Sequence, residues 1–321
     1  MLKKIVVLGT GGTIAGQSRH AGDNVGYTAG QVAVSDLLQA VPGLDKVLGG
    51  RELVSEQVAQ LDSKDMSFAV WRSLAQRCAQ HLADASVDAV LITHGTDTLE
   101  ETAFFLDQML APALLCGKPL VLTCAMRPAS ALTPDGPQNL LDAVALAGSG
   151  RCGVFVVCAG SVHSARQVQK VQTYRVDAFD SGEAGPVAMV EEGRVRWLVT
   201  PEPQPSEWSL PSLAQLDAAQ WPRVEIVLNY AGASAHMVRA LCAPVPEAPL
   251  RGLVVAGTGN GTLHAELEAA LLEAQGQGIR VLRTSRCARG QLVPGPVPAP
   301  LQAVGLPPVK ARIALMLSLM A

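Results

Sequence analysis

Charged and aromatic side chains are scarce in this chain of 321 residues. Charged residues make up 17% of it and aromatic residues 4%, and 25 Lys and Arg nearly balance 28 Asp and Glu, for a net charge of −3. No stretch is rich in Lys or Arg, so we expect neither nucleic acid nor an anionic membrane surface as a partner. No apolar run is long enough to span a bilayer.

Patterns typical of metal sites and disulfide frameworks are also missing. The seven cysteines form an odd set without a C-x-x-C pair, so we expect reduced, mostly buried thiols. No His, Cys or carboxylate cluster has ligand spacing, and we predict neither a metal nor a cofactor. The chain starts with MLKK and enters an apolar segment directly, without a signal-peptide core, which predicts a cytoplasmic location.

Short apolar segments alternate with helical stretches along the chain. This alternation predicts an α/β fold with a mainly parallel sheet, and the half-apolar composition can fill sizeable cores. Prolines and polar residues concentrate in TPEPQPSEWSLP, which predicts a linker. We therefore expect an N-terminal catalytic domain over 1–199, a linker over 200–222 and a smaller C-terminal α/β domain over 223–321. The expected strands are Ile5–Leu8, Ala89–Thr93, Leu120–Thr123, Val154–Cys158, Val224–Leu228, Leu253–Ala256 and Arg280–Arg283.

Two polar loops follow apolar strands and carry hydroxyl side chains. The segment KKIVVLGTGGTIAG presents Thr10 and Thr13 among glycines, and AVLITHGTDTLEE presents Thr96 and Asp97 at the start of a helix. Loops at the ends of parallel strands line one crevice. The glycines also imitate a dinucleotide fingerprint, but Ile14 replaces its third glycine and no acid follows at the expected distance.

At these loops the sequence resembles the bacterial L-asparaginase (asparaginase/glutaminase) family, which carries TGGTIAG and HGTDT motifs. The resemblance continues through GYTAG, DSKDM, CAMRP, DGP, NYA and GTGNG, and spans nearly the whole chain. It implies a larger N-terminal and a smaller C-terminal α/β domain. It also implies a homotetramer, a dimer of dimers, in which a neighbouring subunit completes each site for a small-molecule amide.

The resemblance assigns catalytic roles to five residues. Thr13 would attack the side-chain amide of asparagine, and Tyr27 on the adjacent loop would help to activate it. Thr96, Asp97 and Lys170 would position water or assist proton transfer. An acyl-enzyme route divides one high barrier into two. Sequence alone leaves open whether Thr13 or Thr96 forms the covalent bond.

Each of these residues also has a simpler interpretation. Thr13 and Asp97 could cap the helices that follow them, the second beginning at Leu99. Lys170 lies in the helix-like stretch Ala165–Gln172 and could be a solvated surface charge. Tyr27 could be an ordinary loop aromatic, although the glycines around it would permit a hinged lid.

Substrate binding is expected at Gly12, Ser63, Lys64, Ala125 and Thr262, together with Thr96 and Asp97. Backbone N–H groups around Gly12 and Thr96 could hold the developing oxyanion. The chain departs from the family at Lys64, where family members carry Gln or Glu, and at Thr262, where they carry Asn or Ser.

The segment ARGQLVPGPVPAPL also lacks the Glu that family members supply from a neighbouring subunit. These departures weaken recognition of a free α-ammonium group. We therefore keep two alternatives to asparagine hydrolysis: an amidohydrolase for an ω-amide without a free α-ammonium, and a non-catalytic amino-acid sensor. The asparaginase-like subunit of a tRNA-dependent amidotransferase is a further candidate, but such subunits usually carry an additional N-terminal domain.

Overall fold

The computed structural model describes residues 2–20, 22–110, 115, 117–200, 206–218, 221–296 and 299–321. The chain divides into two compact units, Met1–Pro205 and Ser206–Ala321. The division falls inside the predicted linker 200–222, of which residues 201–205 and 219–220 lie outside the described residues, as does Cys116. The domain limits of the sequence analysis stay predictions.

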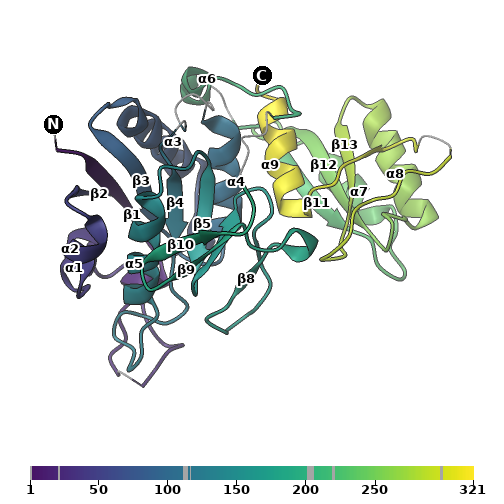
Figure 1. Cartoon of the computed structure of the whole chain (residues 1–321). Helices are drawn as coiled ribbons and strands as arrows, with labels where there is room; N and C mark the ends of the chain where they lie inside the picture. The colour runs from purple at the N-terminus through teal and green to yellow at the C-terminus, as the bar shows by residue number, and fades with distance from the viewer. Residues whose placement is uncertain are drawn as a thin grey trace. The chain divides into compact units, whose positions relative to one another are not determined.

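An eight-stranded sheet forms the centre of the described part of the larger unit, in the order β10-β9-β6-β5-β4-β3-β1-β2 (Figure 1). The strands from β2 to β5 in this order pair in parallel, and those from β5 to β10 pair antiparallel. Their bounds are β1 (Lys4–Gly11), β2 (Glu52–Leu61), β3 (Val87–Thr93), β4 (Leu120–Thr123), β5 (Val154–Cys158), β6 (Ser161–Ser164), β9 (Ala188–Glu191) and β10 (Arg194–Trp197). A separate two-stranded ribbon pairs β7 (Gln169–Lys170) with β8 (Phe179–Asp180).

Helices bury both faces of this sheet. Alternate residues of β1, such as Ile5 and Val7, join a core cluster with α1, α2 and α5. Successive side chains of a strand point to opposite faces, so Val6 and Leu8, each at most 2% exposed, are covered from the other side. The helices are α1 (Val34–Gln39), α2 (Leu44–Leu48), α3 (Phe68–Ala83), α4 (Leu99–Met109) and α5 (Gly136–Ala147), with short 3-10 turns η1 (Thr13–Ala15), η2 (Ser63–Asp65) and η3 (Gly182–Ala184).

The smaller unit contains a four-stranded parallel sheet in the order β11-β12-β13-β14. Helix α9 packs closely on β12, since a Cβ added at Gly252 would lie 2.8 Å from Cδ2 of Leu315. The strands are β11 (Arg223–Leu228), β12 (Leu250–Gly257), β13 (Arg280–Ser285) and β14 (Gln302–Ala303). The helices are α6 (Leu213–Ala218), α7 (His236–Cys242), α8 (Ala265–Gly276) and α9 (Pro308–Ser318).

The predicted fold class is confirmed, and each of the seven expected strands overlaps an observed one. The helix-like interpretation of Ala165–Gln172 is wrong. There the N–H groups of Gln167 and Val168 both donate to the Ser164 carbonyl, after which the chain extends into β7. Pairing of β7 with β8 overrides the helix propensity of this stretch.

The described residues contain neither a candidate membrane span nor a candidate metal site. None of the described helices is long and apolar enough to cross a bilayer. No group of three or more His, Cys, Asp or Glu side chains in that part of the chain is arranged to hold a metal ion. Of the described cysteines, Cys78, Cys124 and Cys158 are buried and Cys287 is exposed.

We predict that Gly12→Ala destabilises the larger unit more than Gly185→Ala does. The two glycines have similar backbone angles, φ +81° and ψ −172° at Gly12 and φ +67° and ψ −178° at Gly185, so an added Cβ meets similar backbone strain of about 1–3 kcal/mol. At Gly12, however, that Cβ would lie 2.3 Å from the Gly95 Cα, whereas Gly185 has nothing within 4 Å. Separating two backbones should cost about 1–3 kcal/mol more. Urea unfolding followed by circular dichroism measures the difference, and equal losses would contradict this contact.

Candidate functional site

The two motif loops meet where β1 and β3 end. Gly12 and Gly95 touch backbone to backbone, and side chains larger than hydrogen would hold the loops apart. The Gly12 N–H donates to the Leu61 carbonyl at 2.8 Å, which anchors the first loop to the end of β2. The hydroxyl-bearing loops predicted from the sequence therefore share one end of the sheet.

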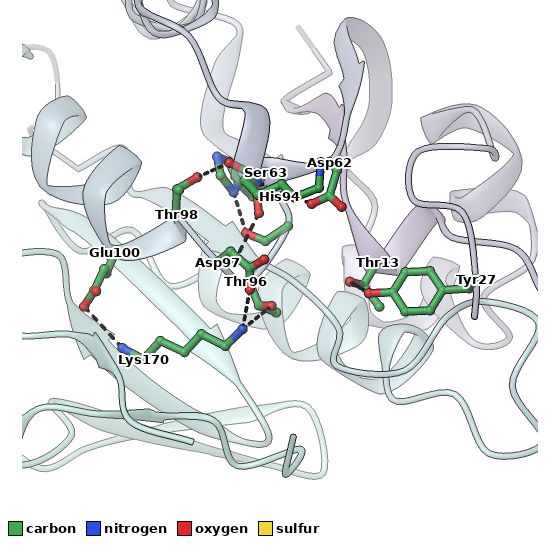
Figure 2. A network of polar contacts seen from close by, with 12 residues as sticks. Thr13, Tyr27, Asp62, Ser63, His94, Thr96, Asp97, Thr98, Glu100 and Lys170 are labelled. Atoms are coloured by element: carbon green, nitrogen blue, oxygen red, sulfur yellow. Dashed lines mark hydrogen bonds and ion pairs between the residues drawn. The ribbon is translucent and has the colours of Figure 1, made fainter. Parts of the chain in front are cut away.

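Thr13 is paired with Tyr27. Their hydroxyl oxygens are 2.6 Å apart, and Thr13 is 7% exposed (Figure 2). The Tyr27 ring packs over Gly16, where an added Cβ would lie 2.7 Å from the ring Cδ2. An antiparallel bridge between Gln17 and Thr28, with N–H···O distances of 3.0 and 2.8 Å, closes the loop that carries Tyr27. The loop holds its tyrosine against the Thr13 hydroxyl.

The capping interpretation of Thr13 is wrong. Thr13 is the first residue of η1, whose N-cap is Gly12, and no side-chain capping bond is formed. The Thr13 hydroxyl is engaged with Tyr27 instead. Helix capping therefore does not explain why a threonine stands at this position.

Burial raises the pKa of Tyr27, and the nearby Asp62 and Asp97 carboxylates raise it further, while the Thr13 hydrogen bond acts in the opposite direction. A phenol ordinarily titrates near pH 10. Tyr27 is therefore a neutral phenol at neutral pH. It can share a hydrogen with Thr13, but it is not a phenolate base at rest.

Lys170 joins the second loop through its side chain. Its Nζ donates to Thr96 Oγ1 at 2.9 Å and to Asp97 Oδ1 at 2.6 Å. Its backbone N–H donates to Glu100 Oε2 at 3.2 Å (Figure 2). The N-cap of α4 is Thr98, so Asp97 is not the cap of that helix. The Lys170 side chain is 18% exposed and paired, which excludes the solvated surface charge.

A buried network fixes the second loop from behind. His94 is fully buried, and burial lowers its pKa to about 4, so its imidazole is neutral at neutral pH. A carbonyl only accepts, so His94 Nδ1–H donates to the Gly95 oxygen at 2.7 Å. His94 Nε2 then accepts from Thr102 Oγ1 at 2.9 Å, and that oxygen accepts from Trp71 Nε1–H at 2.9 Å. The bonds select one tautomer and one orientation of the Gly95 carbonyl.

Ser63 is tied directly to the second loop. It is 2% exposed, its Oγ accepts the Asp97 N–H at 3.1 Å, and its carbonyl accepts from Thr98 Oγ1 at 2.8 Å. Its hydroxyl proton remains available for a further hydrogen bond.

Ala125 is fully buried at the end of β4. The two N–H groups that follow it, those of Met126 and Arg127, each donate to the Asp135 carboxylate at 2.9 Å. Ala125 lies beside Gly136, where an added Cβ would be 3.5 Å from the Ala125 Cβ and 3.0 Å from Cγ1 of Ile14. It therefore belongs to the packing beneath the first loop.

Lys64 and Thr262 each have a partner close by in the sequence. Lys64 Nζ pairs with its neighbour Asp65, and its side chain is 60% exposed. That ion pair, together with the nearby Asp62 and Asp97, raises the pKa of Lys64, so it carries a full positive charge at neutral pH. Thr262 belongs to the smaller unit, where its Oγ1 donates to the Thr258 carbonyl at 2.9 Å.

Several polar partners were missed from the sequence. Trp71 and Thr102 belong to helices, and only the fold brings them to His94. Glu100 lies two positions after the HGTDT motif, and that proximity was the one available signal. Asp135 lies in the DGP string that the family resemblance included, but its role as an acceptor for two N–H groups depends on the loop geometry.

The chain matches one protein-family model in each of its two units. Residues 4–203 match the family model described as asparaginase, N-terminal, and residues 223–321 match the glutaminase/asparaginase C-terminal domain. The chain is 35% identical over 330 residues to a glutaminase-asparaginase of Pseudomonas fluorescens, covering 99% of this chain and 86% of the relative. It is 37% identical over 293 residues to a probable periplasmic L-asparaginase of Haemophilus influenzae, covering 90% and 79%.

A solved structure supports the same relationship. The crystal structure of a probable cytoplasmic L-asparaginase from Campylobacter jejuni matches with a TM-score of 0.88 and 34% identity, covering 99% of this chain and 95% of that one. Family models over both units and relatives along nearly the whole chain agree. This chain belongs to the asparaginase family.

Proposed function

We propose that the protein hydrolyses the side-chain amide of L-asparagine, with L-glutamine as a second substrate, to give the acid and ammonia without a cofactor. The observation that carries this proposal is the pairing of Thr13 with Tyr27 beside the Thr96–Lys170–Asp97 cluster. The names of relatives agree with this proposal, since they include L-asparaginase and glutaminase-asparaginase.

In the proposed acylation step, Thr13 Oγ attacks the amide carbon and forms an ester while the carbon–nitrogen bond breaks. The hydroxyl proton must leave Thr13, and the departing nitrogen must gain a proton to become ammonia. Tyr27 is placed to take part in this transfer because its neutral phenol can accept and donate at 2.6 Å. Water then hydrolyses the ester and regenerates Thr13.

The arrangement of Thr96, Asp97 and Lys170 supports a role for these residues in positioning water. Lys170 donates to both partners, which leaves the Thr96 hydroxyl proton free to bond an incoming oxygen. The peptide unit is planar and trans, so fixing the Gly95 carbonyl toward His94 directs the Thr96 N–H to the opposite side. That N–H and the backbone around Gly12 are the proposed oxyanion donors.

We also propose a homotetramer built from close dimers, in which Thr262 of a neighbouring subunit completes the site. Family membership supports this assembly. Gel filtration and activity measured on dilution test it, since dissociation to monomers should abolish turnover. For location we propose the cytoplasm, as in the name of the Campylobacter relative, whereas the Haemophilus relative is named periplasmic. Immunodetection in cell fractions distinguishes the two.

Lys64 favours a second candidate substrate, an ω-amide without a free α-ammonium group. Its cation follows Ser63 directly, and Ser63 contacts the Asp97 backbone. A positive side chain here disfavours an ammonium group nearby and favours an anionic or neutral one. N-acetyl-L-asparagine and succinamate represent this class.

We predict that Thr13→Ala lowers kcat for ammonia release by about 10³-fold or more, because the acyl acceptor is lost. Thr13→Ser keeps a hydroxyl and serves as the matched control, with activity well above that of the alanine variant. An acylated peptide from the N-terminal loop should appear by mass spectrometry after quenching. Undiminished turnover by Thr13→Ala would move the nucleophile to Thr96 or remove it from both threonines.

We predict that Lys64→Gln lowers KM for L-asparagine several-fold and leaves KM for succinamate unchanged or higher, because removal of a positive charge favours an ammonium group. Lys46→Gln on α2 makes the same change of net charge elsewhere and should alter neither value. Ammonia release across the three amides is the measurement. A strong preference of the unaltered enzyme for free L-asparagine would eliminate the second candidate.

A further inference from the structure

Glu100 contacts Lys170 but takes no part in the chemistry proposed above. It lies in the first turn of α4, three residues after Asp97, and its carboxylate accepts the Lys170 N–H at 3.2 Å. Seventy residues of chain separate the two partners. Figure 2 shows Lys170 extended between Glu100 at its backbone and the Thr96–Asp97 pair at its tip.

Lys170 belongs to a short ribbon whose position depends on the rest of the unit. The ribbon of β7 and β8 has two residues in each strand and is separate from the eight-stranded sheet. A lone two-stranded ribbon is marginally stable in water, so its contacts with the rest of the unit determine where it lies. The ribbon pairs Lys170 with Phe179, and the next N–H, that of Val171, donates back to Ala178. The Lys170 N–H instead donates outward, to α4.

The reach of a lysine depends on where its backbone is held. Four methylene groups separate the backbone from Nζ, and they can adopt many rotamers. Segment 96–100 restricts this freedom at both ends, because Thr96 and Asp97 bind Nζ and Glu100 binds the N–H of the same residue. An error of about 1 Å in a catalytic group can cost on the order of a hundredfold in rate.

We propose that Glu100 is a positioning residue for Lys170: its carboxylate fixes the ribbon backbone at the distance from which Nζ reaches Thr96 and Asp97. The inference rests on the proposed role of Lys170. Glu100 itself contacts Lys170 through the backbone and acts on turnover only through that residue.

Four variants separate this role from others. Glu100→Ala removes the acceptor, and Glu100→Gln keeps an amide oxygen that can accept the same N–H. Glu101→Ala removes a carboxylate from the same helical turn and is the control for the helix dipole. Lys170→Met tests the proposed function independently. Each is assayed for kcat and KM, and circular dichroism confirms the fold.

We expect Glu100→Ala to lower kcat about tenfold or more, with KM within about twofold, since one hydrogen bond to the positioned backbone is lost. Glu100→Gln should restore most of kcat, and Glu101→Ala should match the unaltered enzyme. Should Glu100→Ala fail to fold, Glu100→Asp, which keeps the charge and shortens the reach, takes its place with the same expected loss.

Unchanged kcat in Glu100→Ala, or equal losses in the alanine and glutamine variants, would overturn the inference. A general loss of stability would lower kcat in Glu101→Ala as well, and that result would also overturn it. Full activity in Lys170→Met would instead refute the proposed role of Lys170. The two failures are therefore distinguishable.

Discussion

The site depends on one steric constraint, the backbone contact between Gly12 and Gly95. Parallel strands β1 and β3 are neighbours in the sheet, and at their carboxyl ends the two loops touch without intervening side chains. A Cβ on Gly12 would lie 2.3 Å from the Gly95 Cα, and one on Gly95 would lie 3.1 Å from the Gly12 Cα, so either would push the loops apart. The contact brings the loop that bears Thr13 against the loop that bears Thr96.

Behind this contact, burial gives the second loop a fixed geometry. His94 is kept neutral by desolvation, and its two ring nitrogens have different partners, so the imidazole holds one orientation. The aromatic stack of Trp71 on Phe105, with ring centroids 4.9 Å apart, places the indole N–H that completes the chain of hydrogen bonds. A fully satisfied buried network is rigid because breaking any bond leaves a desolvated polar group.

The sequence predicted those parts of the molecule that are decided locally. Val154–Cys158 and Leu120–Thr123 are continuous apolar runs, and the structure reproduces their bounds. By contrast, β2 lies at the sheet edge with exposed and half-buried residues and no continuous apolar run, and it was not predicted. The strand that contains Lys170 was predicted to be helical. Motif residues Thr13, Ser63, Thr96 and Asp97 were identified, whereas Thr102, Trp71 and Glu100 acquire their roles from contacts made across the fold.

The two halves of the site are supported in different ways, and this difference matches the chemistry proposed for each. Lys170, Ser63 and His94 tie the second loop to the ribbon, to η2 and to the helical layer, so its donors are preorganised. Tyr27 is held by the Gln17–Thr28 bridge, by packing of its ring over Gly16 and by the Thr13 hydrogen bond, on a loop whose Val25 is 76% exposed. In the proposed reaction, a substrate enters and ammonia leaves beside Thr13. An exposed loop has a lower free energy of opening than the buried network around His94, so the loop can open while the donors proposed to stabilise charge remain in place.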